Sequence, residues 1–166
     1  MHSCDPHGSS TNLYPRRVVH NDIMSNTGTP SRPDGLAFPT VVGLHHVRVP
    51  VSDVLASRDW YVETLGLRPI LVTEDEDTVT GIVMRHSSGV VVGLHLAPEQ
   101  SKALAGFAVI GLAVSDLEPW PAHLDGLGVA HSGIVDGHLG QCLRVRDPDG
   151  LLVELHTPAQ PSADEA

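Results

Sequence analysis

The chain has 166 residues, of which 41% are hydrophobic and 4% aromatic, and its net charge is −10. This length allows one domain or two small fused modules with a buried core, and the composition is that of a globular protein. The negative charge argues against nucleic acid and anionic membranes as partners, and it favours neutral or cationic small molecules.

The two ends of the chain differ from its middle. Residues 1–38 are rich in Ser, Thr, Asn, Pro and Gly, so we expect a flexible extension, and Met24 is an alternative start to Met1. Residues 159–166 form a second polar tail. The isolated cysteines, together with the lack of a signal peptide or an apolar run of membrane-spanning length, predict a cytoplasmic protein.

A first module is expected over residues 39–97. It begins with a strand over 41–51, and a helix then starts at Ser52 or Asp53 and ends at Gly66. Three further strands are predicted by their β-branched and alternating residues, over 70–73, 81–85 and 90–96. The acidic run at 74–77 is typical of a solvated hairpin tip.

A second module is expected over residues 107–158, after a linker at 98–106. It begins with a strand over 107–114 and a helix over 116–127, in which Leu117, Trp120, Leu124 and Leu127 have helical spacing. Three strands complete it, over 129–135, 141–146 and 151–156.

The two modules repeat each other in sequence. Val51-Ser52-Asp53 recurs as Val114-Ser115-Asp116, and the segment 89–95 resembles 150–156, both at an offset of roughly sixty residues. The sequence therefore predicts an α+β fold of two tandem βαβββ modules, with a curved mixed sheet around a cleft.

The stretch Asp147-Pro148-Asp149-Gly150 has the residues of a tight turn and leads into the last strand. Side chains alternate along a strand, so Leu152, Glu154 and His156 share one face while Leu151, Val153 and Leu155 share the other. The apolar face must pack on a core. The chemistry is expected on the face of Glu154 and His156.

Four segments carry a family resemblance: His46-Val47, Val51-Ser52-Asp53, residues 60–67 and residues 147–154. Over about residues 41–158 the chain resembles the vicinal oxygen chelate superfamily, which includes glyoxalase I, bleomycin-resistance proteins and extradiol dioxygenases. The resemblance implies the glyoxalase/bleomycin-resistance/dioxygenase fold, a homodimer, and a divalent metal held by the first and last strands of each module. The corresponding positions in this chain are His46, Gly93, Val109 and Glu154, of which His46 and Glu154 carry donors.

Strand alternation gives the residues of the cleft face independently of the resemblance. His46 and Glu154 are the candidate ligands for Fe, Mn, Ni or Zn, and His95 or His156 could supply a third donor. The remaining candidates would contact the substrate: Arg48, Gly93, His95, Val109, Gly111 and His156. If Arg48 pairs with Glu154 instead, the charge of the cleft is already balanced without a metal.

Two functions are open on this basis. In the first, a metal at His46 and Glu154 serves a lyase, isomerase or dioxygenase, and Glu154 also moves protons as a catalytic residue. In the second, the protein binds a drug or metabolite without a metal, as bleomycin-resistance proteins do. Both functions need a small-molecule partner and neither needs nucleic acid or a membrane.

Overall fold

The computed structural model describes residues 41–137 and 140–157, and the described residues from 43 onward belong to one compact unit. The described residues form eight strands and three helices, in the order β1 (Val47–Val51), α1 (Val54–Leu65), β2 (Arg68–Asp75), β3 (Thr78–Arg85), β4 (Val91–Leu96), α2 (Pro98–Leu104), β5 (Ala108–Ala113), α3 (Trp120–Gly126), β6 (His131–Gly137), β7 (Gly140–Arg146) and β8 (Leu152–His156). The predicted extension 1–38 and tail 159–166 lie outside the described residues.

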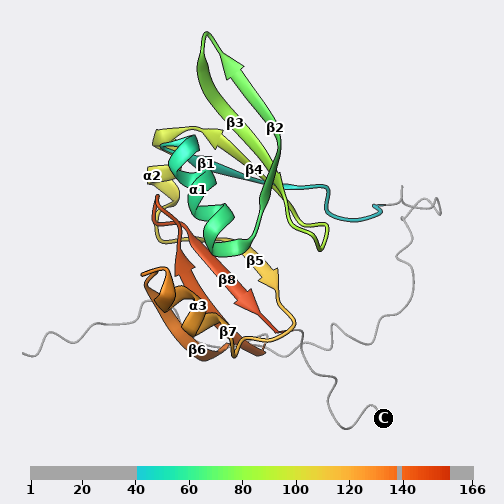
Figure 1. Cartoon of the computed structure of the whole chain (residues 1–166), viewed down its shortest axis with the longest axis vertical. Helices are drawn as coiled ribbons and strands as arrows, with labels where there is room; N and C mark the ends of the chain where they lie inside the picture. The colour runs from blue at the N-terminus through green and yellow to red at the C-terminus, as the bar shows by residue number, and fades with distance from the viewer. Residues whose placement is uncertain (1–40, 138–139, 158–166) are drawn as a thin grey trace, which may run out of the picture. The chain divides into compact units, whose positions relative to one another are not determined.

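The strands form two four-stranded mixed sheets with the same order. The first sheet runs β1-β4-β3-β2 and the second runs β5-β8-β7-β6 (Figure 1). In each sheet the first and last strands of the module pair in parallel, and the other pairs are antiparallel. The prediction of an α+β fold with two tandem βαβββ modules is confirmed.

Helix α1 begins and ends where the sequence predicts. The carboxylate of Asp53 accepts hydrogen bonds from the backbone N–H groups of Leu55 and Ala56, both at 3.0 Å, and so caps the first turn. Gly66 ends the helix in the left-handed region with φ 69°. The face that carries Tyr61 is buried against β3 and β4.

Several elements differ from the sequence prediction. The strand expected over 41–51 starts only at Val47, and the segment 98–106 contains α2. The helix expected over 116–127 is reduced to α3, because prolines at 119 and 121 lack the N–H groups that would extend hydrogen bonding through this region. Before α3 the Asp116 carboxylate instead accepts from the backbone N–H of Glu118 at 2.9 Å, as in an Asx turn.

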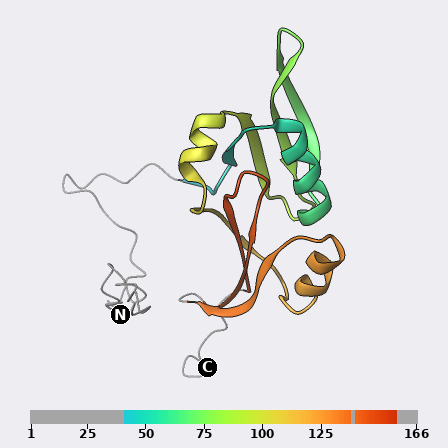
Figure 2. The same cartoon turned by 90° about the vertical axis from the view of Figure 1, so that its left-hand side faces the viewer.

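The hairpin of β2 and β3 is longer than predicted and carries the acidic run at its tip. Glu76 and Asp77 have φ values of 44° and 68°, as a two-residue hairpin turn requires, and both are exposed. In Figures 1 and 2 this hairpin, in green, extends beyond the other strands of its sheet. The tip is solvated, as the sequence predicted.

The turn between β7 and β8 joins the second module to the first. Gly150 has φ 81°, and the carboxylate of Asp147 accepts from the N–H groups of Asp149 at 3.0 Å and Leu151 at 2.9 Å. The other oxygen of Asp147 accepts from the hydroxyl of Tyr61 at 3.2 Å. The backbone N–H of Ser52 donates to the Asp149 carboxylate at 3.1 Å.

The core contains residues of both modules. In β8 and the residue before it, one face is at most 1% exposed and consists of Leu151, Val153 and Leu155. The other face is half-buried, as the alternation predicted, and carries Leu152, Glu154 and His156. Among the described residues, no helix has the length and hydrophobicity that crossing a membrane requires.

Candidate functional site

Glu154 lies at the centre of a hydrogen-bonded group on the half-buried face of β8. Its Oε1 accepts from Nε of Arg144 at 2.7 Å, and its Oε2 lies 3.3 Å from Nε2 of His156. Both oxygens of the carboxylate are therefore engaged by basic side chains. Nδ1 of His156 is buried and has no hydrogen-bond partner in the described part of the chain.

The strand register explains why Arg144 meets Glu154. The two residues are direct partners in the antiparallel pair of β7 and β8, and cross-strand neighbours on one face lie within reach of each other. The hydrogen bond from Arg144 lowers the pKa of Glu154 below its ordinary value, outweighing the opposing effect of burial, and His156 acts in the same direction.

Sequence reasoning missed Arg144, although a signal was available. With residues 148–150 as the loop, residue 147 lies opposite 151, and counting outward from there places residue 144 opposite residue 154. The alternative partner considered for Glu154 was Arg48, but Nη2 of Arg48 lies 3.4 Å from Nδ1 of His95. Arg144 therefore balances the charge of Glu154, and Arg48 contacts another residue of its own sheet.

The candidate residues of the first module gather at the β1 and β4 pair. His46 precedes β1, is exposed, and has its Nδ1 2.8 Å from Nδ1 of His45. An added Cβ at Gly93 would lie 3.9 Å from Cδ2 of His46, so the imidazole lies close to this glycine. Among the hydrogen bonds and ion pairs of the described residues, none joins His46 to Glu154.

The candidate small residues of the second module lie on β5. Gly111 is the parallel partner of Glu154, and an added Cβ there would meet no atom within 4 Å. Val109 lies at the register shift between Ala108 and Ile110, and its side chain is outside the described part of the structure. A glycine beside Glu154 leaves room for a ligand on this face.

The donor set does not fit the metal site that the resemblance implied. Two of the four corresponding positions, Gly93 and Val109, have no donor side chain, and the Glu154 carboxylate is held by Arg144 and His156. Within residues 41–137 and 140–157, no group of three or more His, Cys, Asp or Glu is placed to hold a metal ion. A metal site generally needs at least three protein donors.

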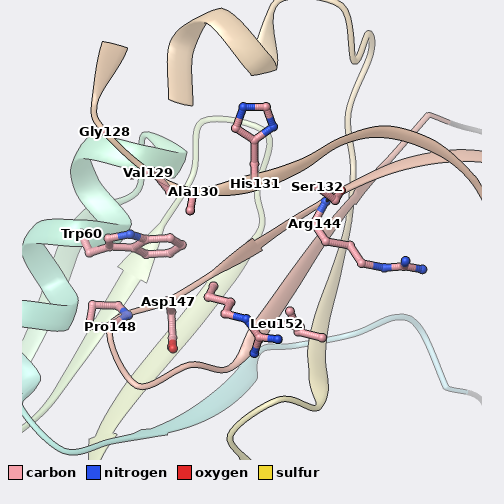
Figure 3. Close-up of a pocket in the computed structure, with 11 residues that line it drawn as sticks. Trp60, Gly128, Val129, Ala130, His131, Ser132, Arg144, Asp147, Pro148 and Leu152 are labelled. Carbon is pink, nitrogen blue, oxygen red and sulfur yellow. The ribbon is translucent and has the colours of Figure 1, made fainter. Parts of the chain in front are cut away.

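A cavity of about 600 Å³ lies beside the hydrogen-bonded group of Glu154, and Arg144 belongs to both. Figure 3 shows the indole of Trp60 projecting from α1 towards the start of β6, close to the loop of Asp147 and Pro148. Arg146 and Leu152 also line the cavity. The volume is within the range of about 300–1,000 Å³ that is usual for small-molecule sites.

Some polar groups of this cavity already form hydrogen bonds within the protein. The Asp147 carboxylate is used by its own turn and by Tyr61. Nε2 of His131 lies 3.3 Å from Asp125, while Nη1 of Arg146 donates to the backbone oxygen of Gly150 at 3.1 Å. A guanidinium has five donors, so Arg146 keeps capacity for a ligand. The cavity thus combines an aromatic surface with a cationic donor.

A protein-family model decides the family of this chain. The model of the Glyoxalase/Bleomycin resistance protein/Dioxygenase superfamily matches residues 43–155, which include both modules. The chain belongs to this superfamily. No curated protein matches the chain.

Solved structures of the superfamily have the same fold. TnmS3, an antibiotic-binding protein from Streptomyces sp. CB03234, has a TM-score of 0.61 at 24% identity, over 73% of this chain and 99% of its own. A glyoxylase/bleomycin resistance protein/dioxygenase domain from Frankia sp. EAN1pec has a TM-score of 0.58 at 19% identity, over 72% and 99% of the two chains. The fosfomycin resistance protein FosX from Listeria monocytogenes has a TM-score of 0.57 at 15% identity, over 76% and 98%. At these identities the similarity shows the fold alone.

Proposed function

We propose that this superfamily member binds a small organic molecule without a metal ion. One observation carries the proposal: Arg144 and His156 occupy the two oxygens of Glu154. The residue that corresponds to a metal ligand in the superfamily is here a charge-balanced part of a binding surface. An arginine paired this closely would also repel a cation.

The ligand site is the cavity beside this group. Trp60 offers an aromatic surface on which a planar ring can stack, and Arg146 offers free donors for an acceptor group of the ligand. Arg144, whose charge is balanced by Glu154, lines one side of the site. TnmS3 is described as antibiotic-binding, and a drug or metabolite with a ring and a polar acceptor suits the cavity of this chain.

The candidates His95, Gly93 and Gly111 lie on β4 and β5 and are not among the residues that line this cavity. They are therefore not ligand contacts under this proposal. Catalysis by Glu154 is not part of the proposal, because its lowered pKa and its two partners make it a poor proton acceptor at neutral pH.

Metal content tests the absence of a resident metal. Protein purified without chelators is analysed by inductively coupled plasma mass spectrometry, alongside Glu154→Gln and His46→Ala. We expect substoichiometric Fe, Mn, Ni and Zn that neither substitution changes, and no rise in melting temperature when these ions are added. One equivalent of a metal that both variants lose would contradict the proposal and favour the metal-dependent enzyme.

Ligand binding is tested through the two tryptophans of the chain. A small-molecule library is screened by quenching of intrinsic fluorescence in Trp120→Phe, which leaves Trp60 as the only tryptophan. Hits should lose affinity in Arg146→Met, while Arg85→Met, an exposed arginine on β3, serves as the matched control. Equal affinity in both variants would place the ligand elsewhere.

The predicted cytoplasmic location and homodimer belong to the same proposal, and light scattering after size exclusion tests the dimer.

A further inference from the structure

A second cavity, of about 340 Å³, lies apart from Trp60 and Glu154. It is bounded by the segment after α1, the turn between β3 and β4, and the segment that leads from β5 into α3. Its walls are mainly apolar and include Leu67, Val90, Leu112 and Trp120. The volume is large enough for a small ligand.

His86 is a polar group of this cavity, and its hydrogen bonds indicate which ring nitrogen is the acceptor. The backbone N–H of Ser88 donates to Nδ1 of His86 at 3.1 Å, and the Ser88 hydroxyl lies 2.8 Å from the same atom. Because a backbone N–H can only donate, Nδ1 must be the unprotonated acceptor. The proton of the neutral ring is therefore on Nε2.

Nε2 of His86 is an uncommitted donor. No residue in the described part of the chain accepts a hydrogen bond from it, and the imidazole lies beside Gly66, where an added Cβ would be 3.9 Å from Nε2. The glycine is required there by its left-handed backbone, so no side chain at this position covers the ring edge. The cavity thus has apolar walls and one oriented N–H donor.

We propose that this second cavity binds a neutral, largely apolar aromatic molecule that carries one hydrogen-bond acceptor, such as a carbonyl oxygen. The apolar walls take up the ring system, with Trp120 as an aromatic neighbour. Nε2–H of His86 donates to the acceptor and orients it. Among the described residues, those that line this cavity include no Asp, Glu, Lys or Arg, which is the reason for a neutral ligand.

A neutral fluorescent ketone, 6-propionyl-2-dimethylaminonaphthalene, is the probe for this site. Its emission reports transfer from water into an apolar, hydrogen-bonding environment. We expect saturable one-to-one binding to the full chain with a blue shift of the emission. The absence of saturable binding would overturn the proposal.

The role of the donor is tested first on the wild-type protein by competition. 2-Acetylnaphthalene and 2-isopropylnaphthalene have nearly the same shape, but only the ketone accepts a hydrogen bond. One hydrogen bond predicts that the ketone displaces the probe about 2- to 12-fold more tightly. Equal competition by the two compounds would overturn the role of Nε2–H, and this result depends on no substitution.

Variants then locate the probe. His86→Phe keeps a ring but removes the donor, and the probe should bind about 2- to 12-fold more weakly. Val90→Trp fills the cavity from a side chain that is 38% exposed, and it should reduce affinity at least tenfold. The matched control is Val62→Trp, which adds the same side chain at a residue of α1 that is 36% exposed and lies outside the cavity. Unchanged affinity in both cavity variants would overturn the proposal.

The outcome is independent of the function proposed above. Arg146→Met alters the larger cavity only, so it should leave binding of the ketone unchanged. A loss of ketone binding in Arg146→Met, with no effect of Val90→Trp, would assign the probe to the larger cavity and reject a second site.

Discussion

The hydroxyl of Tyr61 donates a hydrogen bond to the buried carboxylate of Asp147 across 86 positions of the sequence, at 3.2 Å. Asp147 is 4% exposed and Tyr61 is fully buried. The bond links the helix of the first module to the turn of the second, beside the cavity that contains Trp60. The turn holds β7 and β8 in the register that pairs Arg144 with Glu154, so this contact supports the candidate site.

Removing the hydroxyl of Tyr61 should destabilise the fold. In Tyr61→Phe one oxygen of Asp147 stays buried without its donor, and a buried unsatisfied group costs about 1–3 kcal/mol. Urea unfolding followed by circular dichroism measures the change in the free energy of unfolding. Val62→Ala, at the neighbouring exposed residue, is the control and should change it little; an equally small effect of Tyr61→Phe would show that the bond is dispensable.

The same tyrosine should make stability depend on alkaline pH. Burial, and then the negative charge of Asp147, raise the pKa of Tyr61 above its ordinary value. The folded state therefore holds the phenol proton more tightly than the unfolded state. The stability due to this difference is complete below about pH 10 and is lost as the pH rises above it.

The measurement for this pH effect is the melting temperature between pH 8 and pH 11. Over this range the melting temperature of the wild type should fall more than that of Tyr61→Phe. The other groups that titrate at alkaline pH are common to both proteins. Parallel curves for the two proteins would contradict a raised pKa at Tyr61.

Loss of Arg144 should raise the pKa of Glu154. The hydrogen bond from Arg144 is the largest cause of the lowered pKa, so in Arg144→Met the pKa of Glu154 should rise towards the ordinary value for glutamate. Carbon-13 NMR of the side-chain carboxyl follows the titration directly.

The lowered pKa of Glu154 also predicts how the stability of the fold changes with acidic pH. A lowered pKa stabilises the folded state above the ordinary glutamate value, and this contribution disappears as the pH falls through the acidic range. Arg144→Met should therefore show a weaker acid dependence than wild type. Arg85→Met keeps the wild-type titration of Glu154; a shift of similar size in that variant would point to a general charge effect instead of the direct bond.

The turn between β7 and β8 should tolerate no side chain at Gly150. Its φ of 81° is in the left-handed region, so Gly150→Ala is expected to cost about 1–2 kcal/mol. Gly111→Ala is the matched control, because Gly111 has no positive φ and an added Cβ there has open space around it. Equal unfolding free energies for the two variants, measured in urea, would reject the strain argument.

The sequence by itself determined the duplicated fold and the chemical face of β8. The internal repeat, the caps of α1 and the turn at 147–150 are local signals, and local signals suffice where backbone preference and hydrophobic periodicity agree. Side-chain alternation placed Glu154 and His156 on one face because a strand has a period of two. The helix predicted from residue 116 begins only at Trp120, and the sequence did not show where it starts, because that depends on the turn that precedes α3.

The tertiary structure alone decided which groups meet. Glu154 is paired by Arg144 and not by Arg48 because β7, and not β1, is its antiparallel neighbour in the sheet. The contact of Tyr61 with Asp147 and the two cavities depend on packing between segments that are far apart in the sequence. The geometry of this contact and of the cavities depends on how side chains from both modules pack together. The periodicity of any one segment does not contain this information.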